Sequence, residues 1–275
     1  MKLVAIQLNG GAHWEHNRQQ IVQQLAALPE GRPCLVLLPE NFACLGTTAD
    51  YQAVAEPIGD GPIQHQLAAW ARQWNIWLVA GSLPTRVAGE SRLHTSSLVY
   101  GPDGRLQGHY HKLHLFDVDV ADGHGHYRES ASFLPGERWC VVDSPFGGLG
   151  LSICYDVRFP ELYRQLRAAG ASVLLVPAAF TYVTGQAHWL PLLRARAIEN
   201  QCYVVAANQC GQHGAGRHTW GHSVIIDPWG QLLAEAEHQV GLIQAELDPK
   251  FLTQIRHDMP VLNHARLRSG WREPE

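Results

Sequence analysis

Short apolar runs of strand length alternate with amphipathic helical segments along this chain, and this alternation constrains the fold more than any other feature. The runs expected to form buried strands are 3–8, 34–38, 76–80, 149–154, 173–177, 203–207, 223–227 and 240–247. The segments with apolar residues at threes and fours, expected to form helices, are 13–28, 63–74, 160–169 and 188–201. Alternating strands and helices favour an α/β fold.

Two pairs of runs break the alternation and predict β-hairpins. Residues 93–100 lead through a Gly-Pro-Asp-Gly turn into 106–112, and residues 223–227 lead through Pro-Trp-Gly into 231–235. A mixed sheet, or two sheets, is therefore expected rather than a purely parallel one. The stretch 117–135, rich in Gly, His and Asp, is expected to be irregular, and a loop of that length is more often functional than not.

The composition argues against several classes of protein. The 275 residues carry 21 Lys and Arg against 25 Asp and Glu, so no basic field is available to bind nucleic acid. No uncharged apolar run approaches the roughly 18 residues needed to cross a bilayer. The opening MKLVAIQLNGG is typical of a first strand rather than a secretory signal. Six dispersed cysteines without a CxxC pair are expected to be reduced thiols, and we therefore expect a cytoplasmic protein that does not associate with membranes.

Three chemically capable side chains lie at the ends of predicted strands. Cys154 closes the run GLGLSIC, just before a helix expected to start at Pro160. Glu40 follows the apolar run CLVLLP, and Lys112 ends the second strand of the first hairpin. A lone cysteine at such a position is usually a small buried hydrophobe, and each charged residue taken alone is more often solvated.

The three residues together predict more than each does alone, because active sites in open α/β folds form where strand ends meet at one rim of a sheet. A carboxylate, an ammonium and a thiol supply a base, an oxyanion-stabilising cation and a nucleophile for attack on a carbonyl. The backbone N–H of Tyr155 is a second candidate oxyanion donor. The sequence therefore predicts a hydrolytic site built on Glu40, Lys112 and Cys154.

A cluster of histidines suggests a metal site as an alternative. Its members are His109, His111, His114, His124 and His126. His109 and His111 would share a strand face, but no carboxylate or cysteine lies at a recognisable zinc spacing. The Gly-Gly-Leu-Gly at 147–150 lacks the Lys-Ser or Lys-Thr of a phosphate-binding loop and indicates a turn. Neither a metal nor another cofactor is expected.

The blocks around the three residues resemble the Glu-Lys-Cys motifs of the nitrilase superfamily of carbon–nitrogen hydrolases. They read LLPENF around Glu40, YHKLHLFD around Lys112 and GLSICYDVRFPELYR around Cys154, spaced by 72 and 42 residues. The similarity runs in unbroken order from about residue 2 to residue 266, which implies a single domain over 1–275. The resemblance implies an αββα sandwich of two mixed sheets flanked by helices, paired as a homodimer.

Within the superfamily the chain is more similar to the branch of amidases that act on 2-oxo amides, the deaminated glutathione amidase and omega-amidase branch. The matching stretches include HLFDVDV, GHSVIIDPWG and the MPVLNHAR tail. RARAIENQCYVVAANQCG and the arginine-containing loop GQHGAGRHTWGHS resemble the first of these two amidases more than the second.

The resemblance assigns roles residue by residue. It implies that Glu40 is the general base, Cys154 the nucleophile and Lys112 the oxyanion stabiliser. Glu129 matches a second active-site glutamate that positions the lysine and the substrate, although a solvated loop charge was an equal alternative from the residue alone.

The same resemblance implies a set of substrate-binding residues, namely Tyr155, Arg158, Phe180 and Thr184. Arg158 and Thr184 match positions that bind a 2-oxo acid carboxylate, and a guanidinium fork suits that anion. No metal is implied at the site.

The implied reaction is hydrolysis of the amide of deaminated glutathione to 2-oxoglutarate and cysteinylglycine through a Cys154 acyl-enzyme. The small-molecule partner would then be a 2-oxo acid amide. The alternatives are an omega-amidase acting on 2-oxoglutaramate, a nitrilase or N-carbamoyl hydrolase, and a non-catalytic member of the fold that binds metabolites or partners through the same pocket.

Overall fold

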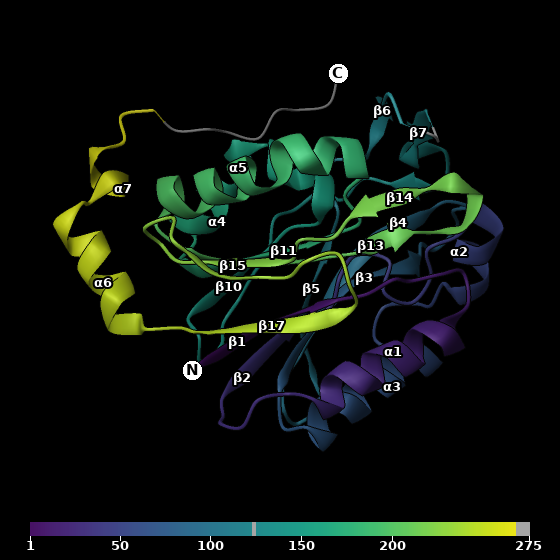
Figure 1. Cartoon of the computed structure of the whole chain (residues 1–275), viewed down its shortest axis with the longest axis horizontal. Helices are drawn as coiled ribbons and strands as arrows, with labels where there is room; N and C mark the ends of the chain where they lie inside the picture. Colours follow the sequence, from purple (N-terminus) through teal and green to yellow (C-terminus); the bar gives the residue numbers. More distant parts are fainter. Residues whose placement is uncertain (123–124, 268–275) are drawn as a thin grey trace.

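Two mixed β-sheets stacked face to face form the centre of the computed structural model, which describes residues 1–122 and 125–267 (Figure 1). The first sheet has the order β17 (Gly241–Glu246), β1 (Lys2–Gln7), β2 (Cys34–Leu37), β3 (Trp77–Arg86), β4 (Leu93–Tyr100) and β5 (Leu106–His111), and β8 (Phe133–Leu134) pairs with β4. The second has the order β16 (Leu232–Glu235), β15 (Val224–Ile226), β12 (Tyr203–Asn208), β11 (Ala171–Ala178), β10 (Gly148–Leu151) and β9 (Val141–Val142).

Helices cover the outer faces of both sheets, and shorter elements surround one end. The α-helices are α1 (Trp14–Ala26), α2 (Thr48–Val54), α3 (Pro62–Gln73), α4 (Pro160–Ala168), α5 (Tyr182–Asn200), α6 (Pro249–Asp258) and α7 (Val261–His264). Two ribbons, β6 (Asp117–Asp119) with β7 (His126–Arg128) and β13 (Cys210–Gln212) with β14 (His218–Trp220), lie outside the main sheets. Three 3₁₀ turns complete the set: η1 (Glu129–Ala131), η2 (Cys154–Arg158) and η3 (Gly214–Gly216).

The side-chain alternation of the strands creates the layers. On β1, Leu3 and Ala5 enter the core between the sheets, whereas Val4 and Ile6 enter a second core on the other face of the first sheet. Strand β2 follows the same alternation. Every one of these side chains is fully buried, which explains why such strands have the composition of continuous apolar runs.

The helices bury one stripe each against those faces. Ile21 and Leu25 of α1 and Leu67 of α3 complete the outer core of the first sheet, and α1 and α3 lie together below it in Figure 1. Tyr163 of α4 and Trp189 of α5 pack on the second sheet. The expected α/β sandwich of two mixed sheets flanked by helices is therefore confirmed, as are both hairpins, β4–β5 and β15–β16.

Three expected elements differ from the observed ones. The strand expected over 149–154 ends at Leu151, because its pairing with β11 stops there and the chain turns into η2. The helix expected over 188–201 starts earlier, at Tyr182, because its first turns pack on β14 through buried Gly185, which carries no apolar signal. The stretch 117–135 is not wholly irregular, since β6, β7, η1 and β8 lie within it.

Within the described ranges, 1–122 and 125–267, no helix combines the length and the apolar character that a membrane crossing requires.

The end of β2 is held by close contact with β3. Leu38 donates its N–H to the carbonyl of Val79 at 2.9 Å, and the Cα of Gly81 faces the carbonyl oxygens of Leu38 and Pro39 so closely that a Cβ would overlap them. Glycine is therefore required here for backbone approach.

Replacing Gly81 by Ala is expected to lower the free energy of unfolding by about 1–3 kcal/mol, because the new methyl group must push the backbone after β2 away from β3. Gly241→Ala is the matched control, since nothing lies within 4 Å of its Cβ position. Urea unfolding of both variants measures the difference. Equal stability of the Gly81 variant and the wild type would show that this contact does not constrain the strand end.

Candidate active site

Glu40, Lys112 and Cys154 meet at one end of the sandwich, as their positions at strand ends predict. Glu40 lies just after β2, Lys112 directly follows β5, and Cys154 begins η2 after β10. All three line one cavity of about 510 Å³. The other sequence-predicted residues, Tyr155, Arg158, Phe180, Thr184 and Glu129, line the same cavity.

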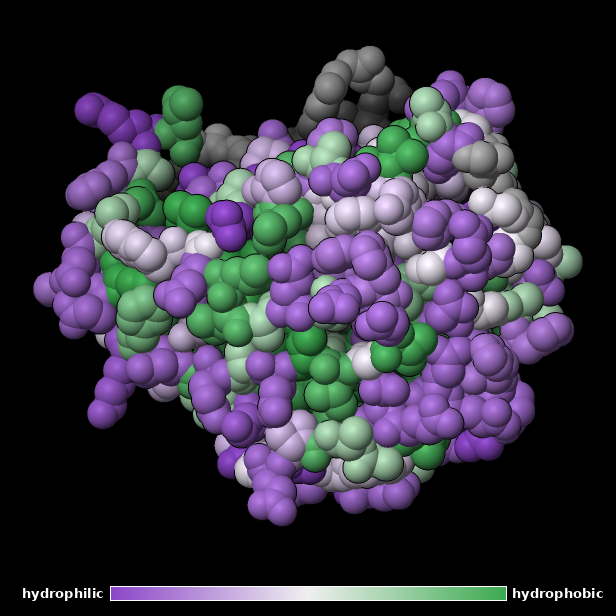
Figure 2. Space-filling model, in the orientation of Figure 1, coloured by the Kyte–Doolittle hydropathy of each residue, from purple (hydrophilic) through white to green (hydrophobic). Residues whose placement is uncertain are grey.

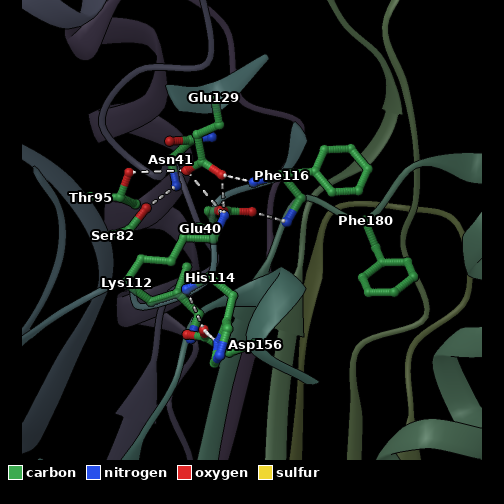
Figure 3. A network of polar contacts seen from close by, with 12 residues as sticks. Glu40, Asn41, Ser82, Thr95, Lys112, His114, Phe116, Glu129, Asp156 and Phe180 are labelled. Atoms are coloured by element: carbon green, nitrogen blue, oxygen red, sulfur yellow. Dashed lines mark hydrogen bonds and ion pairs between the residues drawn. The ribbon is translucent and has the colours of Figure 1, made fainter. Parts of the chain in front are cut away.

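Lys112 lies between two carboxylates (Figure 3). Its Nζ is 2.9 Å from Oε1 of Glu40, and it is 3.1 and 2.9 Å from the two carboxylate oxygens of Glu129. The side chains of Lys112 and Glu40 are almost fully buried. Water therefore screens this network little, and its three charges depend on one another.

The pKa shifts of Glu40 and Lys112 follow from this arrangement. Burial opposes the charged form of Glu40, but the adjacent Lys112 outweighs it and lowers the pKa of the carboxyl. Burial likewise opposes the charge of Lys112, but Glu129 and Glu40 outweigh it and raise the pKa of the ammonium well above its ordinary value. Both groups are therefore ionised at neutral pH.

Both oxygens of the Glu40 carboxylate are fixed. Oε1 accepts from Lys112, and Oε2 accepts from the backbone N–H of Ala179, directly after β11, at 2.8 Å. The backbone carbonyl of Glu40 accepts from Nε2 of Gln209 at 3.0 Å. The second sheet thus orients a carboxylate that the first sheet carries.

Glu129 lies in the segment 117–135, which the sequence indicated as functional, and residues outside that segment hold its carboxylate. Its Oε2 accepts from the N–H of Phe116 at 2.7 Å, and its Oε1 accepts from Oγ1 of Thr95 at 3.2 Å (Figure 3). Both carboxylate oxygens of Glu129 also accept from Nζ of Lys112. The solvated alternative for this residue is therefore excluded, because its side chain is only 14% exposed.

Cys154 is held in a left-handed backbone conformation, with φ of +47°. The buried carboxylate of Asp156 fixes this turn: Oδ2 accepts from the N–H of Ile153 at 2.8 Å and from the hydroxyl of Tyr110 at 2.8 Å. Oδ1 accepts from the N–H of His114 at 3.1 Å. No sequence pattern marks Asp156, apart from its position two residues after the cysteine.

Burial, followed by the negative charge of Glu40, raises the pKa of the Cys154 thiol well above its ordinary value. The Glu40 carboxylate is the charged group that acts most strongly on this thiol, and both side chains line the same cavity. The resting arrangement is therefore a protonated thiol beside an ionised carboxylate, which can take up the thiol proton during attack on a carbonyl.

The remaining predicted residues form one wall of the cavity. The guanidinium carbon of Arg158 lies 5.2 Å from the ring centre of Phe180 and 5.8 Å from that of Tyr155. Thr184 contacts Oγ1 of Thr181 at 2.7 Å. An arginine stacked on two aromatic rings is oriented without being neutralised.

Arg217 is a cavity residue to which the sequence analysis gave no role, although its loop was part of the resemblance. Its Nη2 donates to the carbonyl of Ala179 at 3.3 Å. Tyr51 and Tyr127 also line the cavity, and neither follows a sequence pattern.

Among residues 1–122 and 125–267, no group of three or more His, Cys, Asp and Glu side chains could hold a metal ion. His94 and His111 instead stack with ring centres 4.2 Å apart. Burial and the neighbouring His94 and His109 lower the pKa of His111 to about 4. His124 lies outside the described residues.

The model of the carbon–nitrogen hydrolase family matches residues 2–257. The chain belongs to this family. The deaminated glutathione amidase of Yersinia enterocolitica is 46% identical over 267 residues, which cover 96% of this chain and 93% of that protein.

Solved structures agree with this family membership. The crystal structure of the Caenorhabditis elegans NitFhit protein is 38% identical and has a TM-score of 0.88, covering 96% of this chain and 65% of that one. An amidase from Nesterenkonia is 29% identical with a TM-score of 0.77, covering 95% of this chain and 99% of that one. That structure shows acrylamide added to the active-site cysteine.

Replacing Lys112 by Met should lower the free energy of unfolding by about 3–5 kcal/mol, because two buried carboxylates lose their shared counter-ion. This loss of unfolding free energy should be larger at pH 8 than at pH 5. Without the lysine, burial is expected to raise the folded-state pKa of the Glu40 carboxyl above its unfolded value, so this group contributes stability at acid pH that is lost as pH rises through the folded-state pKa.

Urea unfolding at the two pH values measures this effect. Lys2→Met is the control, because Lys2 pairs with the exposed Glu246 and its loss should cost less than about 1 kcal/mol. A Lys112→Met penalty that does not change with pH would contradict the proposed charge balance.

Proposed function

We propose that this protein hydrolyses the amide of deaminated glutathione, giving 2-oxoglutarate and cysteinylglycine. The observation that carries the proposed chemistry is the meeting of Glu40, Lys112 and Cys154 in one cavity, with Nζ of Lys112 2.9 Å from the Glu40 carboxylate. The substrate is supported by the relatives at 40–46% identity that are named deaminated glutathione amidase. Of the two amidases in the branch, omega-amidase is not favoured by these names.

In the acylation step, Sγ of Cys154 bonds to the amide carbonyl carbon while its proton passes to Glu40. The tetrahedral intermediate then collapses, the C–N bond breaks, and Glu40 returns the proton to the departing amine of cysteinylglycine. The thioester of 2-oxoglutarate remains on Cys154. Proton transfer is proposed to be direct because the thiol and the carboxylate line the same cavity and act on each other electrostatically.

Lys112 and the N–H of Tyr155 are proposed to stabilise the oxyanion. An ammonium has three N–H donors: one contacts Glu40, one is proposed to be shared by the two oxygens of Glu129, and the third is then left for the substrate. Tyr155 is the second residue of η2, where the first N–H groups have no partner within the turn. Each such donor typically contributes about 10²–10³-fold in rate.

In the deacylation step, a water molecule attacks the thioester carbonyl while Glu40 takes its proton. The C–S bond breaks, 2-oxoglutarate leaves, and Glu40 returns the proton to Sγ of Cys154. Glu129 is proposed to hold Lys112 and the substrate in place through both half-reactions, since its carboxylate contacts Lys112 with both oxygens.

Arg158 is proposed to bind the carboxylate of the 2-oxo acid, with Thr184, Phe180 and Tyr155 forming the surrounding wall. A guanidinium can bind a carboxylate through two parallel hydrogen bonds. Arg158 has no carboxylate partner among the described side chains, and its Nη1 contacts only Nδ1 of His188, at 3.3 Å. Its charge is therefore available to an anionic substrate.

We also propose a single domain over 1–275, a homodimer, and a cytoplasmic role in metabolite repair. All six cysteines are free thiols, which supports a reducing compartment.

The proposed homodimer is supported by apolar side chains on the outer face of α5. Val183 is 45% exposed and Ile198 is 49% exposed, as expected if this helical layer pairs with a second copy in the way that the family resemblance implies. Figure 2 shows further hydrophobic side chains gathered among hydrophilic ones on one face of the molecule.

Cys154→Ala should abolish turnover of deaminated glutathione, because no other group at this position can form the thioester. Intact mass spectrometry of the wild type quenched during turnover should show one added 2-oxoglutaryl group, and none in the variant. Cys140→Ala, which removes a free thiol that does not line the cavity, is the control and should keep full activity. Turnover by Cys154→Ala would exclude the proposed mechanism.

The proposed dimer predicts a mass twice that of the chain in size-exclusion chromatography with light scattering. Ile198→Asp should weaken this association, because it introduces a charge into the exposed apolar face of α5. Gln23→Asp, at an exposed position of α1, is the control. A monomeric wild type at micromolar concentration would exclude the dimer.

A further inference from the structure

Arg217 is a cavity arginine with unused hydrogen-bonding capacity. It lies between η3 and β14, and its Nη2 donates to the carbonyl of Ala179 at 3.3 Å. Its Nε is buried and has no hydrogen-bond partner. Among the residues that the structure describes, no carboxylate lies within salt-bridge distance of this guanidinium. A buried N–H donor without a partner is costly unless a ligand supplies an acceptor.

The other charged groups that line the cavity already have partners. Lys112 is shared by two glutamates, and Arg128 pairs with Asp119 at 2.8 Å. Asp50 is directed to the start of α2, where its Oδ2 accepts from the N–H and the hydroxyl of Thr47 at 2.8 and 2.7 Å. Arg158 and Arg217 are thus the cavity arginines left without a carboxylate in the described part of the chain.

The two arginines come from different segments of the chain, η2 and the loop before β14. Arg158 stacks over Phe180, whereas Arg217 contacts the carbonyl of the preceding residue, Ala179, and lies 5.9 Å from the ring centre of Tyr127. The N–H of that same Ala179 holds Glu40. The reacting amide, between Glu40 and Cys154, would therefore lie close to both guanidinium groups.

We propose that Arg217 binds the terminal carboxylate of the leaving group, and so selects amides whose amine part is itself anionic. This inference rests on the proposed function: deaminated glutathione carries one carboxylate on its 2-oxo end and another on its glycine end. The cysteinylglycine part spans roughly 7 Å when extended, which lets one substrate reach both arginines. 2-Oxoglutaramate has no carboxylate on its amine side and would engage Arg158 alone.

Burial opposes the charge of Arg217, but Tyr51 and Glu40 outweigh it and keep the pKa raised. The guanidinium therefore remains charged throughout the working pH range, and its planar fork suits a carboxylate. Its positive charge also acts on Glu40, in the direction that lowers the pKa of that carboxyl.

The test compares kcat/KM of wild type and Arg217→Met on three amides: deaminated glutathione, its glycinamide analogue, which lacks the terminal charge, and 2-oxoglutaramate. For the variant we expect a loss of roughly 10- to 100-fold on deaminated glutathione and less than about threefold on the other two. The wild type should itself discriminate against the glycinamide analogue by a similar factor. Arg217→Lys should recover part of the loss, since it restores the charge without the fork.

Two controls separate recognition from structure. Arg105→Met removes an exposed guanidinium on the β4–β5 turn and should change none of the three values. The pattern of losses across the three amides is the second control, because a structural defect caused by Arg217→Met would lower kcat/KM on all three amides alike, whereas loss of recognition lowers it on deaminated glutathione alone.

Equal losses on all three amides, or a loss confined to 2-oxoglutaramate, would overturn the role of Arg217 while leaving the proposed function intact. A wild type that hydrolyses none of the three amides would overturn the proposed function itself, and this inference with it. The wild-type measurements alone distinguish these two outcomes.

Discussion

The sharing of one buried ammonium by two carboxylates is the interaction on which the candidate site depends. Lys112 keeps Glu40 ionised in surroundings where burial alone would favour the neutral acid. Burial, together with the ionised Glu40, keeps the neighbouring Cys154 thiol protonated. Base and nucleophile thus take opposite protonation states, and Glu129 anchors the cation that holds the base ionised.

The sandwich makes this arrangement possible because each sheet supplies part of it. The first sheet carries Glu40 and Lys112, and the second carries Cys154 together with the Ala179 N–H that orients Glu40. The contact between the two sheets is a fully buried apolar core. A shift of one sheet against the other would therefore separate the reacting groups, so the apolar packing also maintains the geometry of the polar site.

The sequence predicted the layers and the three central residues because both follow from local patterns. Continuous apolar runs identify strands buried on two faces, and a polar residue where such a run stops is placed at a sheet rim. Asp156, Arg217 and the Ala179 N–H escaped this reasoning, since their partners are distant in sequence and a backbone donor has no side-chain signature. The early start of α5 was missed because Gly185 packs against Trp220 without any apolar side chain of its own.

Infrared difference spectroscopy at neutral pH tests the central claim most directly, by reporting where the proton shared by Cys154 and Glu40 resides. The account predicts an S–H stretching band in the wild type that disappears in Cys154→Ala. It also predicts that the wild-type and Glu40→Gln spectra show the same protonated-carboxyl bands, because Glu40 is already ionised in the wild type. A wild-type spectrum without that S–H band, but with a protonated-carboxyl band abolished by Glu40→Gln, would place the proton on Glu40 and contradict the account.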